Sequence, residues 1–226
     1  MWQSLVDEGI AAQGDAAGFE IVAVALDNAD AARPWIEAAH PTYRCLIDVD
    51  HHVAALYHLV NVPQAVWIDE AGRIVRPPES AGANDAFRAM DRVNGTLPPD
   101  VMAERQRLRA AYLDALRDWV RQGATSAHAM TAPAATARLS LPDDRTAEAH
   151  AHFRLGRHLQ QLGRADEARA VFDRASALHP DSWAMWRQAA PKDTRGLASG
   201  AAFWARVDAL GDRPYYPPTD LATPSA

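Results

Sequence analysis

Residues 61–75 read NVPQAVWIDEAGRIV, and this stretch decides the fold predicted for the first part of the chain. The apolar run 65–68 predicts a strand, residues 69–72 predict a hairpin loop that contains glycine, and residues 73–75 predict the partner strand. Pro77 and Pro78 follow, and because proline cannot donate to a sheet ladder we expect them to end the sheet.

An apolar run earlier in the chain, Phe19 to Leu26, predicts a strand covered on both faces in a parallel sheet. Asp27 and Asn28 follow it and are residue types that cap helices, which favours a helix over about 30–39. The remaining segments predict an α/β domain over residues 1–96, with a short helix near residues 2–10, an extended segment at 43–47, a helix that starts at Asp50 and a helix over about 84–93.

Residues 97–226 show no strand pattern and predict an all-α domain. We expect a helix over about 100–122, a connector over 123–142 that is rich in Ala, Ser, Thr and Pro, and helical structure over 183–210. Residues 149–182 follow the pattern of one tetratricopeptide repeat. Its small residues Gly156 and Ala168 favour two closely packed antiparallel helices with Phe172 in the seam.

The run from Phe19 to Pro78 resembles the TlpA/ResA-like, or redoxin, branch of the thioredoxin-fold family. The likeness is carried by FEIVAVALDN (19–28), CLIDVDHHVAALYHL (45–59) and NVPQAVWIDEAGRIV (61–75). It implies that Val62 and Pro63 belong to a substrate groove, that the peptide bond between them is cis, and that the partners are protein or peptide thiols and disulfides. From the residues alone, the alternative is that Pro63 only begins a strand.

Members of that family begin with a central strand and a W-x-x-C-x-x-C motif, neither of which precedes Trp2 here. We therefore expect an incomplete thioredoxin-like sheet whose central first strand is missing, with a gap of about 9.6 Å between its neighbours. We also expect that Met1 is an internal methionine and that the natural polypeptide carries a C-x-x-C or U-x-C segment ahead of it.

The resemblance implies a thiol-disulfide oxidoreductase that is inactive as this chain, so no catalytic residue and no cofactor are assigned. The alternative is a non-enzymatic peptide-binding protein, in which a degenerate thioredoxin fold and the helical repeat grip a peptide together. A third candidate, a peroxiredoxin-type peroxidase, requires an exposed Cys45. Cys45 is the single cysteine, so it rules out an internal disulfide, and its apolar neighbours favour a buried core thiol.

Two further groups of residues have both a functional and a structural interpretation. Asp27 and Asn28 lie where the family often keeps an acid that moves a proton, although helix capping is favoured. The histidines at 51, 52, 58, 150, 152 and 158 lack the spacing of metal ligands, so we predict solvent-facing histidines and no metal site. The segment GDRPYYPP (211–218) is either a partner-binding tail or, as we favour, a segment packed across the helical domain.

The composition describes an ordinary globular protein. Of the 226 residues 48% are hydrophobic and 23% are charged, and the formal charge of −6 is spread along the chain. These values discount nucleic acid and an anionic membrane as partners. The absence of an apolar stretch of about 20 residues and of a basic, apolar leader leads us to expect that this chain stays in the cytoplasm.

Overall fold

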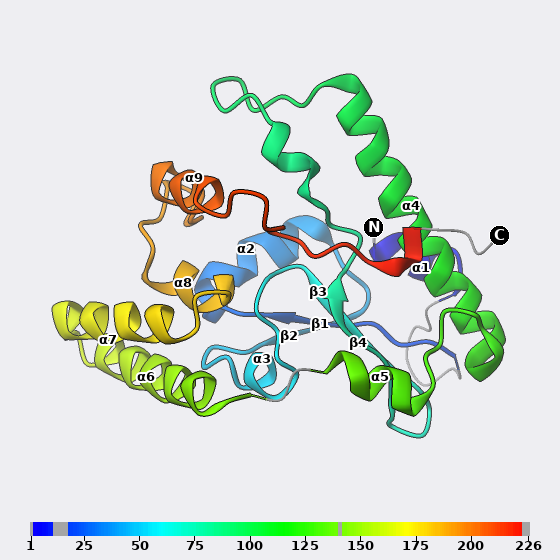
Figure 1. Cartoon of the computed structure of the whole chain (residues 1–226), viewed down its shortest axis with the longest axis horizontal. Helices are drawn as coiled ribbons and strands as arrows, with labels where there is room; N and C mark the ends of the chain where they lie inside the picture. Colours follow the sequence, from blue (N-terminus) through cyan, green and yellow to red (C-terminus); the bar gives the residue numbers. More distant parts are fainter. Residues whose placement is uncertain (1, 11–17, 140–141, 223–226) are drawn as a thin grey trace. The chain divides into compact units, whose positions relative to one another are not determined.

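The computed structural model describes residues 2–10, 18–139 and 142–222 (Figure 1). The chain divides into two compact units. Unit 1 consists of Met1–Val60 and Pro142–Ala189, and unit 2 consists of Asn61–Leu141 and Ala190–Ala226. Each unit therefore combines segments from both sides of the boundary at 96/97, which stays a prediction.

Unit 1 begins with an α/β part. Strands β1 (Val22–Ala25) and β2 (Arg44–Ile47) pair in parallel, with Val22 opposite Arg44 and Ala25 opposite Ile47. The helices of this part are α1 (Trp2–Asp7), α2 (Ala29–Ala39), which joins the two strands, and α3 (His52–Leu56). Residues 11–17, between α1 and β1, lie outside the described residues.

The helix caps of this part are only partly those that the sequence predicted. Asn28 caps α2 as expected, because its Oδ1 accepts a hydrogen bond of 2.9 Å from the backbone N–H of Ala31. The start of α3 was predicted wrongly. Asp48, rather than Asp50, accepts hydrogen bonds from the first N–H groups of α3, at 2.7 Å from His52 and 2.8 Å from Val53.

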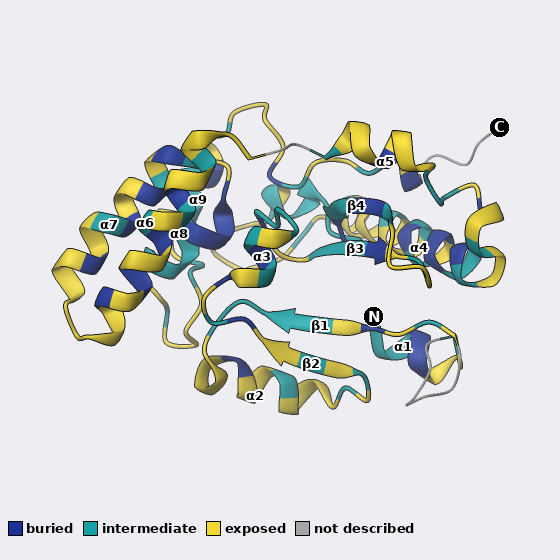
Figure 2. Ribbon diagram, turned by 90° about the horizontal axis from the view of Figure 1, so that it is seen from below, coloured by how far each residue is buried: buried dark blue, intermediate teal, exposed yellow. Residues whose placement is uncertain are grey.

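Strand β1 is shorter and less covered than the predicted run Phe19 to Leu26 (Figure 2). Val22 is 49% exposed and Leu46 in β2 is 51% exposed, so the expectation that both faces are covered was wrong. The physical reason is that, among the described residues, β1 pairs with β2 alone and its other edge has no partner strand.

The helical repeat was predicted correctly. Helices α6 (Asp144–Gln161) and α7 (Ala165–Leu178) pack against each other, and α8 (Trp183–Ala189) follows. A Cβ atom on Gly156 would lie 2.7 Å from Cε1 of Phe172, so glycine permits the predicted close approach. The buried seam of the repeat consists of Ala149, Phe153, Leu159, Ala168, Phe172, Ala175, Leu178 and Met185.

Unit 2 is built on an antiparallel hairpin of β3 (Gln64–Ile68) and β4 (Ile74–Ser80). The expectation that Pro77 and Pro78 end the sheet was wrong, because β4 continues to Ser80 opposite Gln64. The register shifts between the pairs Ala65↔Glu79 and Trp67↔Arg76, which leaves both prolines in a bulge where no ladder N–H is needed.

The remaining elements of unit 2 differ from the prediction at several places. Helix α4 (Pro99–Gln122) was expected, but the helix predicted over 84–93 is the short 3₁₀ helix η1 (Asp85–Ala89). The connector 123–142 contains η2 (Gly123–Thr125) and α5 (Ala132–Arg138), and helix α5 is capped by Thr131. The stretch 183–210 is interrupted after α8 by Pro191 and resumes at α9 (Ala201–Asp208), before the C-terminal η3 (Asp220–Ala222).

Aromatic side chains form the centre of unit 2. Trp67 on β3 stacks on Trp119 of α4 with 5.1 Å between the ring centroids. Its indole N–H donates a hydrogen bond of 3.0 Å to the hydroxyl of Tyr112, also on α4. This contact fixes α4 against the hairpin that carries the candidate site.

Candidate functional site

Val62 and Pro63, the predicted groove residues, precede β3 directly. The peptide bond between them is cis, as the resemblance implied. The carbonyl of Pro63 accepts a hydrogen bond of 3.2 Å from the backbone N–H of Ala81, while the side chain of Val62 remains 40% exposed. The position is therefore fixed to the hairpin and accessible from outside.

Another part of this same chain lies against Val62. We call residues 211–222 the C-terminal segment; it is the red trace that passes over the hairpin in Figure 1. The hydroxyl of Tyr216 donates a hydrogen bond of 2.8 Å to the carbonyl of Val62. The side-chain amide of Asn61 donates one of 3.2 Å to the carbonyl of Tyr215.

Asp85 holds the C-terminal segment by its backbone. Its two carboxylate oxygens accept hydrogen bonds from successive N–H groups, at 2.9 Å from Tyr215 and 2.6 Å from Tyr216. Asp85 is the first residue of η1, which Asn84 caps by accepting a hydrogen bond from the N–H of Ala86. The local cap therefore orients the residue that binds the segment.

Two more side chains bind carbonyl groups of the C-terminal segment. Arg88 donates hydrogen bonds of 2.8 Å to the carbonyl of Gly211 and 3.1 Å to that of Arg213. Ser80 at the end of β4 donates a longer one, of 3.4 Å, to the carbonyl of Pro217. Side chains rather than a neighbouring strand thus bind the backbone of the segment between residues 211 and 217.

The aromatic side chains of the C-terminal segment pack on η1 and α9. Tyr215 is buried, with its ring centroid 4.9 Å from that of Phe87 and 5.8 Å from that of Phe203. The ring centroid of Tyr216 lies 5.9 Å from that of the same Phe87. The contacts have the edge-to-face geometry that aromatic pairs favour.

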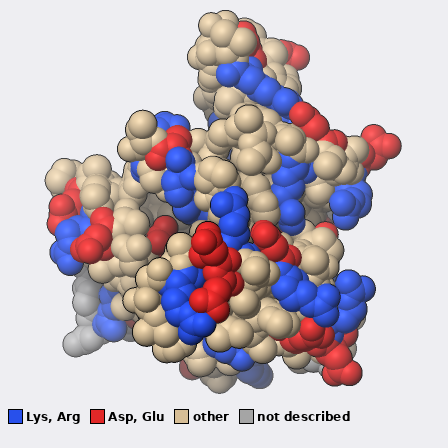
Figure 3. All heavy atoms as spheres, turned by 90° about the vertical axis from the view of Figure 1, so that its left-hand side faces the viewer, with Lys and Arg blue, Asp and Glu red and all other residues tan. Residues whose placement is uncertain are grey.

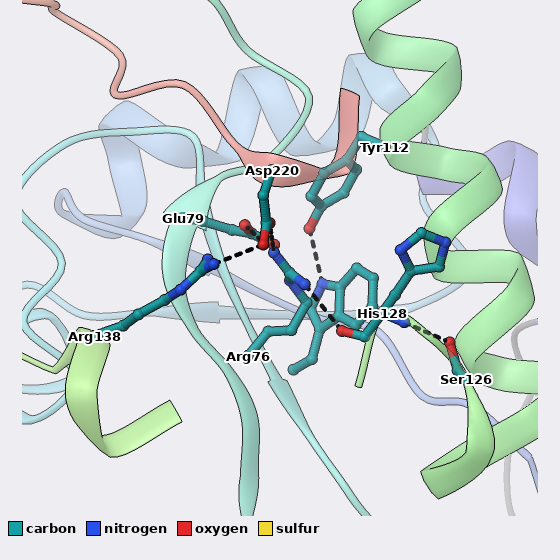
Figure 4. Close-up of polar contacts among 8 residues, drawn as sticks. Arg76, Glu79, Tyr112, Ser126, His128, Arg138 and Asp220 are labelled. Atoms are coloured by element: carbon teal, nitrogen blue, oxygen red, sulfur yellow. Dashed lines mark hydrogen bonds and ion pairs between the residues drawn. The ribbon is translucent and has the colours of Figure 1, made fainter. Parts of the chain in front are cut away.

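A buried arginine ties the end of the C-terminal segment to β4 (Figure 4). Arg76 is 2% exposed and donates two hydrogen bonds to the carboxylate of Glu79, at 2.7 and 3.0 Å. It donates a third, of 2.9 Å, to the carbonyl of His128 and forms an ion pair with Asp220. Asp220 also accepts a hydrogen bond of 2.6 Å from Arg138 on α5.

These charges shift one another's pKa values. Burial alone would raise the pKa of Asp220, but hydrogen bonds from Arg138 and Arg76 outweigh burial and lower it to about 2. Burial alone would lower the pKa of Arg76, yet the carboxylates of Glu79 and Asp220 raise it above its ordinary value. The carboxylate of Asp220 is therefore ionised at pH 7.

The C-terminal segment leaves a shallow hollow beside it. The hollow measures about 260 Å³ and lies between the bulge of β4, helix α5 and the proline pair of the segment. Its lining includes Pro77, Pro78, Glu79, Arg138, Pro217 and Pro218. One side of the bound segment is thus accessible.

The other predicted site residues belong to unit 1. Asn28 caps α2, and the carboxylate of Asp27 accepts a hydrogen bond of 2.8 Å from the N–H of Asn28. Proton transfer by Asp27 stays a prediction. Cys45 on β2 is half-buried, its Sγ lies 3.8 Å from the carbonyl of Tyr43, and burial raises the pKa of the thiol.

His51 was predicted to face solvent, and this was wrong. It is 2% exposed, its ring centroid lies 4.7 Å from that of Phe153, and its Nε2–H donates to the carbonyl of Leu26 at 3.2 Å. Burial lowers the pKa of His51 to about 4, an effect that the charge of Asp48 only partly offsets. His51 is therefore a neutral core residue at pH 7.

Two features of the described residues concern metal ions and membranes. In that part of the chain, no three His, Cys, Asp or Glu side chains gather as a metal site requires. None of the helices described is both long enough and apolar enough to cross a membrane. On the face shown in Figure 3, acidic and basic side chains lie intermingled.

Comparison with known proteins defines one part of the chain. Residues 149–190 match the tetratricopeptide repeat family, in agreement with the repeat read from the sequence and with helices α6 to α8. Neither the curated proteins nor the solved structures contain a match to the chain.

The residues that bind the C-terminal segment were not found from the sequence. Asn84 followed by Asp85 is a cap signal, but nothing local shows that Asp85 binds residues 215 and 216. The stretch 211–218 was singled out, and it does pack rather than extend into solvent. It packs on β4 and η1 as well as on the helices of unit 2.

Proposed function

We propose that this chain carries the peptide-binding surface of a thioredoxin-like thiol-disulfide oxidoreductase, joined to a tetratricopeptide repeat. One observation supports this most directly. The carbonyl of Val62 accepts a hydrogen bond from the hydroxyl of Tyr216 in the C-terminal segment, at the position where the resemblance expects substrate. Asp85 beside it binds two backbone N–H groups of the same segment, and groups that bind the backbone of one segment can bind that of another peptide.

The pairing of the strands supports the same proposal. The described strands form two separate two-stranded sheets, β1 with β2 and β3 with β4. In a thioredoxin-like sheet a central strand joins two such pairs. Within the described residues, each pair has two outer edges without a partner strand, one on each of its strands, and such an edge offers N–H and C=O groups to a further strand. The proposal places that further strand, with a redox pair beside it, against the outer edges of β1 and β3.

The chemistry of such an oxidoreductase needs two chalcogen atoms. A thiolate or selenolate attacks the disulfide of the substrate, the S–S bond breaks, and one substrate thiolate leaves as a mixed disulfide forms. A resolving thiolate then attacks the mixed disulfide, forms a bond to the first chalcogen and releases the second substrate thiolate, so that the redox pair is oxidised as the substrate disulfide is reduced. Because this chain has one cysteine, and because the raised pKa of Cys45 lowers its thiolate fraction, we expect binding without reduction.

Reduction of insulin by dithiothreitol tests the catalytic part of the proposal. The 226-residue chain should leave the rate at its uncatalysed value. Turnover by this chain that the substitution Cys45→Ser removes would contradict the proposal and give Cys45 the redox role.

Binding of an extended, alkylated cysteine peptide tests the peptide-binding part. Val62 is 40% exposed, so the substitution Val62→Glu places a charge in the surface that the peptide would contact. It should abolish binding measured by fluorescence anisotropy. Val93→Glu is the matched control, because Val93 is 92% exposed in a turn of the same unit. Equal affinity of both variants would show that peptides do not bind beside Val62.

A second candidate is a non-enzymatic protein-binding protein. The tetratricopeptide match at 149–190 favours it, since stacked helical repeats commonly present binding surfaces to proteins or peptides. The intact mass and sequence of the protein isolated from its source separate the two candidates. A C-x-x-C or U-x-C segment ahead of Met1 favours the oxidoreductase, and a native start at Met1 favours the binding protein.

A further inference from the structure

We infer that the C-terminal segment is a built-in competitor for the groove beside Val62, and that the partner which replaces it is a peptide of similar chemistry. That chemistry is an aromatic pair, a proline pair and an acidic residue. The inference rests on the proposed function of the groove, and it adds how access to the groove is controlled.

The first argument is the way in which the backbone of the C-terminal segment is held. Asp85, Arg88, Asn61 and Ser80 bind its N–H and C=O groups through their side chains. Backbone groups are common to every extended peptide, so these contacts do not depend on the segment being part of this chain. They provide affinity for a peptide supplied from outside.

The second argument concerns the side chains that the surface selects. Tyr215 is buried against Phe87 and Phe203, which defines an aromatic position. Pro217 and Pro218 follow and favour an extended backbone with little loss of entropy. Asp220 then reaches Arg76 and Arg138, which defines an anionic position. An acidic peptide with aromatic and proline residues fits this order.

The third argument is that the anchors allow the segment to leave. When Asp220 departs, Arg76 keeps both hydrogen bonds to Glu79, so no buried charge is left without a partner. Arg138 is half exposed and water can solvate it. The hollow of about 260 Å³ beside Pro217 and Pro218 gives an incoming peptide a place to start. Exchange between the segment and a peptide therefore leaves no buried charge unpaired, and the aromatic position that Tyr215 vacates is refilled by the aromatic residue of the peptide.

The test uses the full chain and a labelled peptide with the sequence of residues 211–222, GDRPYYPPTDLA. The double variant Tyr216→Phe with Asp220→Asn removes two anchors from the segment and keeps every groove residue. It should bind the peptide at least about tenfold more tightly than the unaltered chain. The reason is that the apparent affinity equals the intrinsic affinity multiplied by the fraction of molecules whose site is open, and the bound segment keeps that fraction small. Asp212→Asn removes the same charge from an exposed position in the same segment and should leave the affinity unchanged.

The outcomes separate this inference from the proposed function. Equal, tight binding to all three chains would keep the groove as a peptide site and refute the competing role of the segment. Binding to none would refute both. If the double variant does not fold, amide hydrogen exchange of the unaltered chain decides: saturating peptide should speed exchange at Tyr215 and Tyr216, and unchanged exchange with the peptide bound would refute the inference.

Discussion

Arg76 and Asp220 form an ion pair across 144 residues of sequence. The arginine is buried in the hairpin, where Glu79 also binds it through two hydrogen bonds, and the aspartate belongs to the C-terminal segment. One guanidinium thus joins the bulge of β4 to the end of the chain.

Replacement of Arg76 should destabilise the protein strongly. Arg76→Gln leaves the nearly buried carboxylate of Glu79 without its cation, so the free energy of unfolding should fall by about 3 to 5 kcal/mol in urea denaturation. Arg107→Gln is the matched control, because Arg107 pairs with Glu104 at the surface, where both side chains are half exposed, and an exposed pair contributes about 0 to 1 kcal/mol. Equal losses in the two variants would count against the structural role of Arg76.

The contribution of Asp220 should depend on pH. Its pKa is about 2 in the folded protein, below the value of about 3.9 expected in the unfolded chain. Stability from its ion pairs is therefore complete above about pH 4 and is lost as the pH falls towards 2. The difference in the free energy of unfolding between the unaltered chain and Asp220→Asn should therefore be constant above about pH 4 and should shrink as the pH falls towards 2. A difference that is independent of pH between 5 and 2 would exclude the ion pairs as its source.

His51 should make unit 1 sensitive to mild acid. Its pKa is about 4 when folded and about 6.5 when unfolded, so below about pH 6.5 only the unfolded state gains the proton. Stability should fall by up to about 3 kcal/mol as the pH drops from 6.5 to 4.

Two asparagine variants check this titration. His51→Asn tolerates the positive φ of 55° at this position and should remove that part of the pH dependence. His52→Asn, at an exposed neighbour, should keep it. A proton titration of His51 near pH 6.5 in NMR spectra would contradict the prediction.

Gly156 should tolerate no larger residue. In Gly156→Ala the added Cβ would lie 2.7 Å from Phe172 in the buried seam of the repeat, and overpacking of this kind costs about 1 to 3 kcal/mol. Gly200→Ala is the control, because no atom lies within 4 Å of its added Cβ. Thermal unfolding should show a lower midpoint for the first variant alone.

Local patterns predicted the features that depend on local chemistry. The cap of Asn28 on α2 and the approach of Gly156 to Phe172 follow from short stretches of sequence, whereas the cis bond before Pro63 was implied by the family resemblance. The extension of β4 through Pro77 and Pro78 did not, because the bulge that accommodates them depends on the register of the partner strand.

Long-range contacts account for what the sequence could not show. Asp85 binds the backbone of residues some 130 positions later, and Asp220 finds Arg76 across 144 positions. His51 is buried because Phe153 of the helical repeat packs on it, although its own neighbours in sequence favour an exposed helix start. In each of these contacts, the sequence pattern of one segment does not indicate which distant segment it will bind.

Amide hydrogen exchange at Tyr215 and Tyr216 tests the central claim most directly, because Asp85 accepts a hydrogen bond from each of these N–H groups. In the unaltered chain both amides should exchange at least about tenfold more slowly than in an unstructured peptide, and Asp85→Ala should remove the protection. Exchange at the unstructured rate in the unaltered chain would show that the C-terminal segment does not lie in the groove beside Val62.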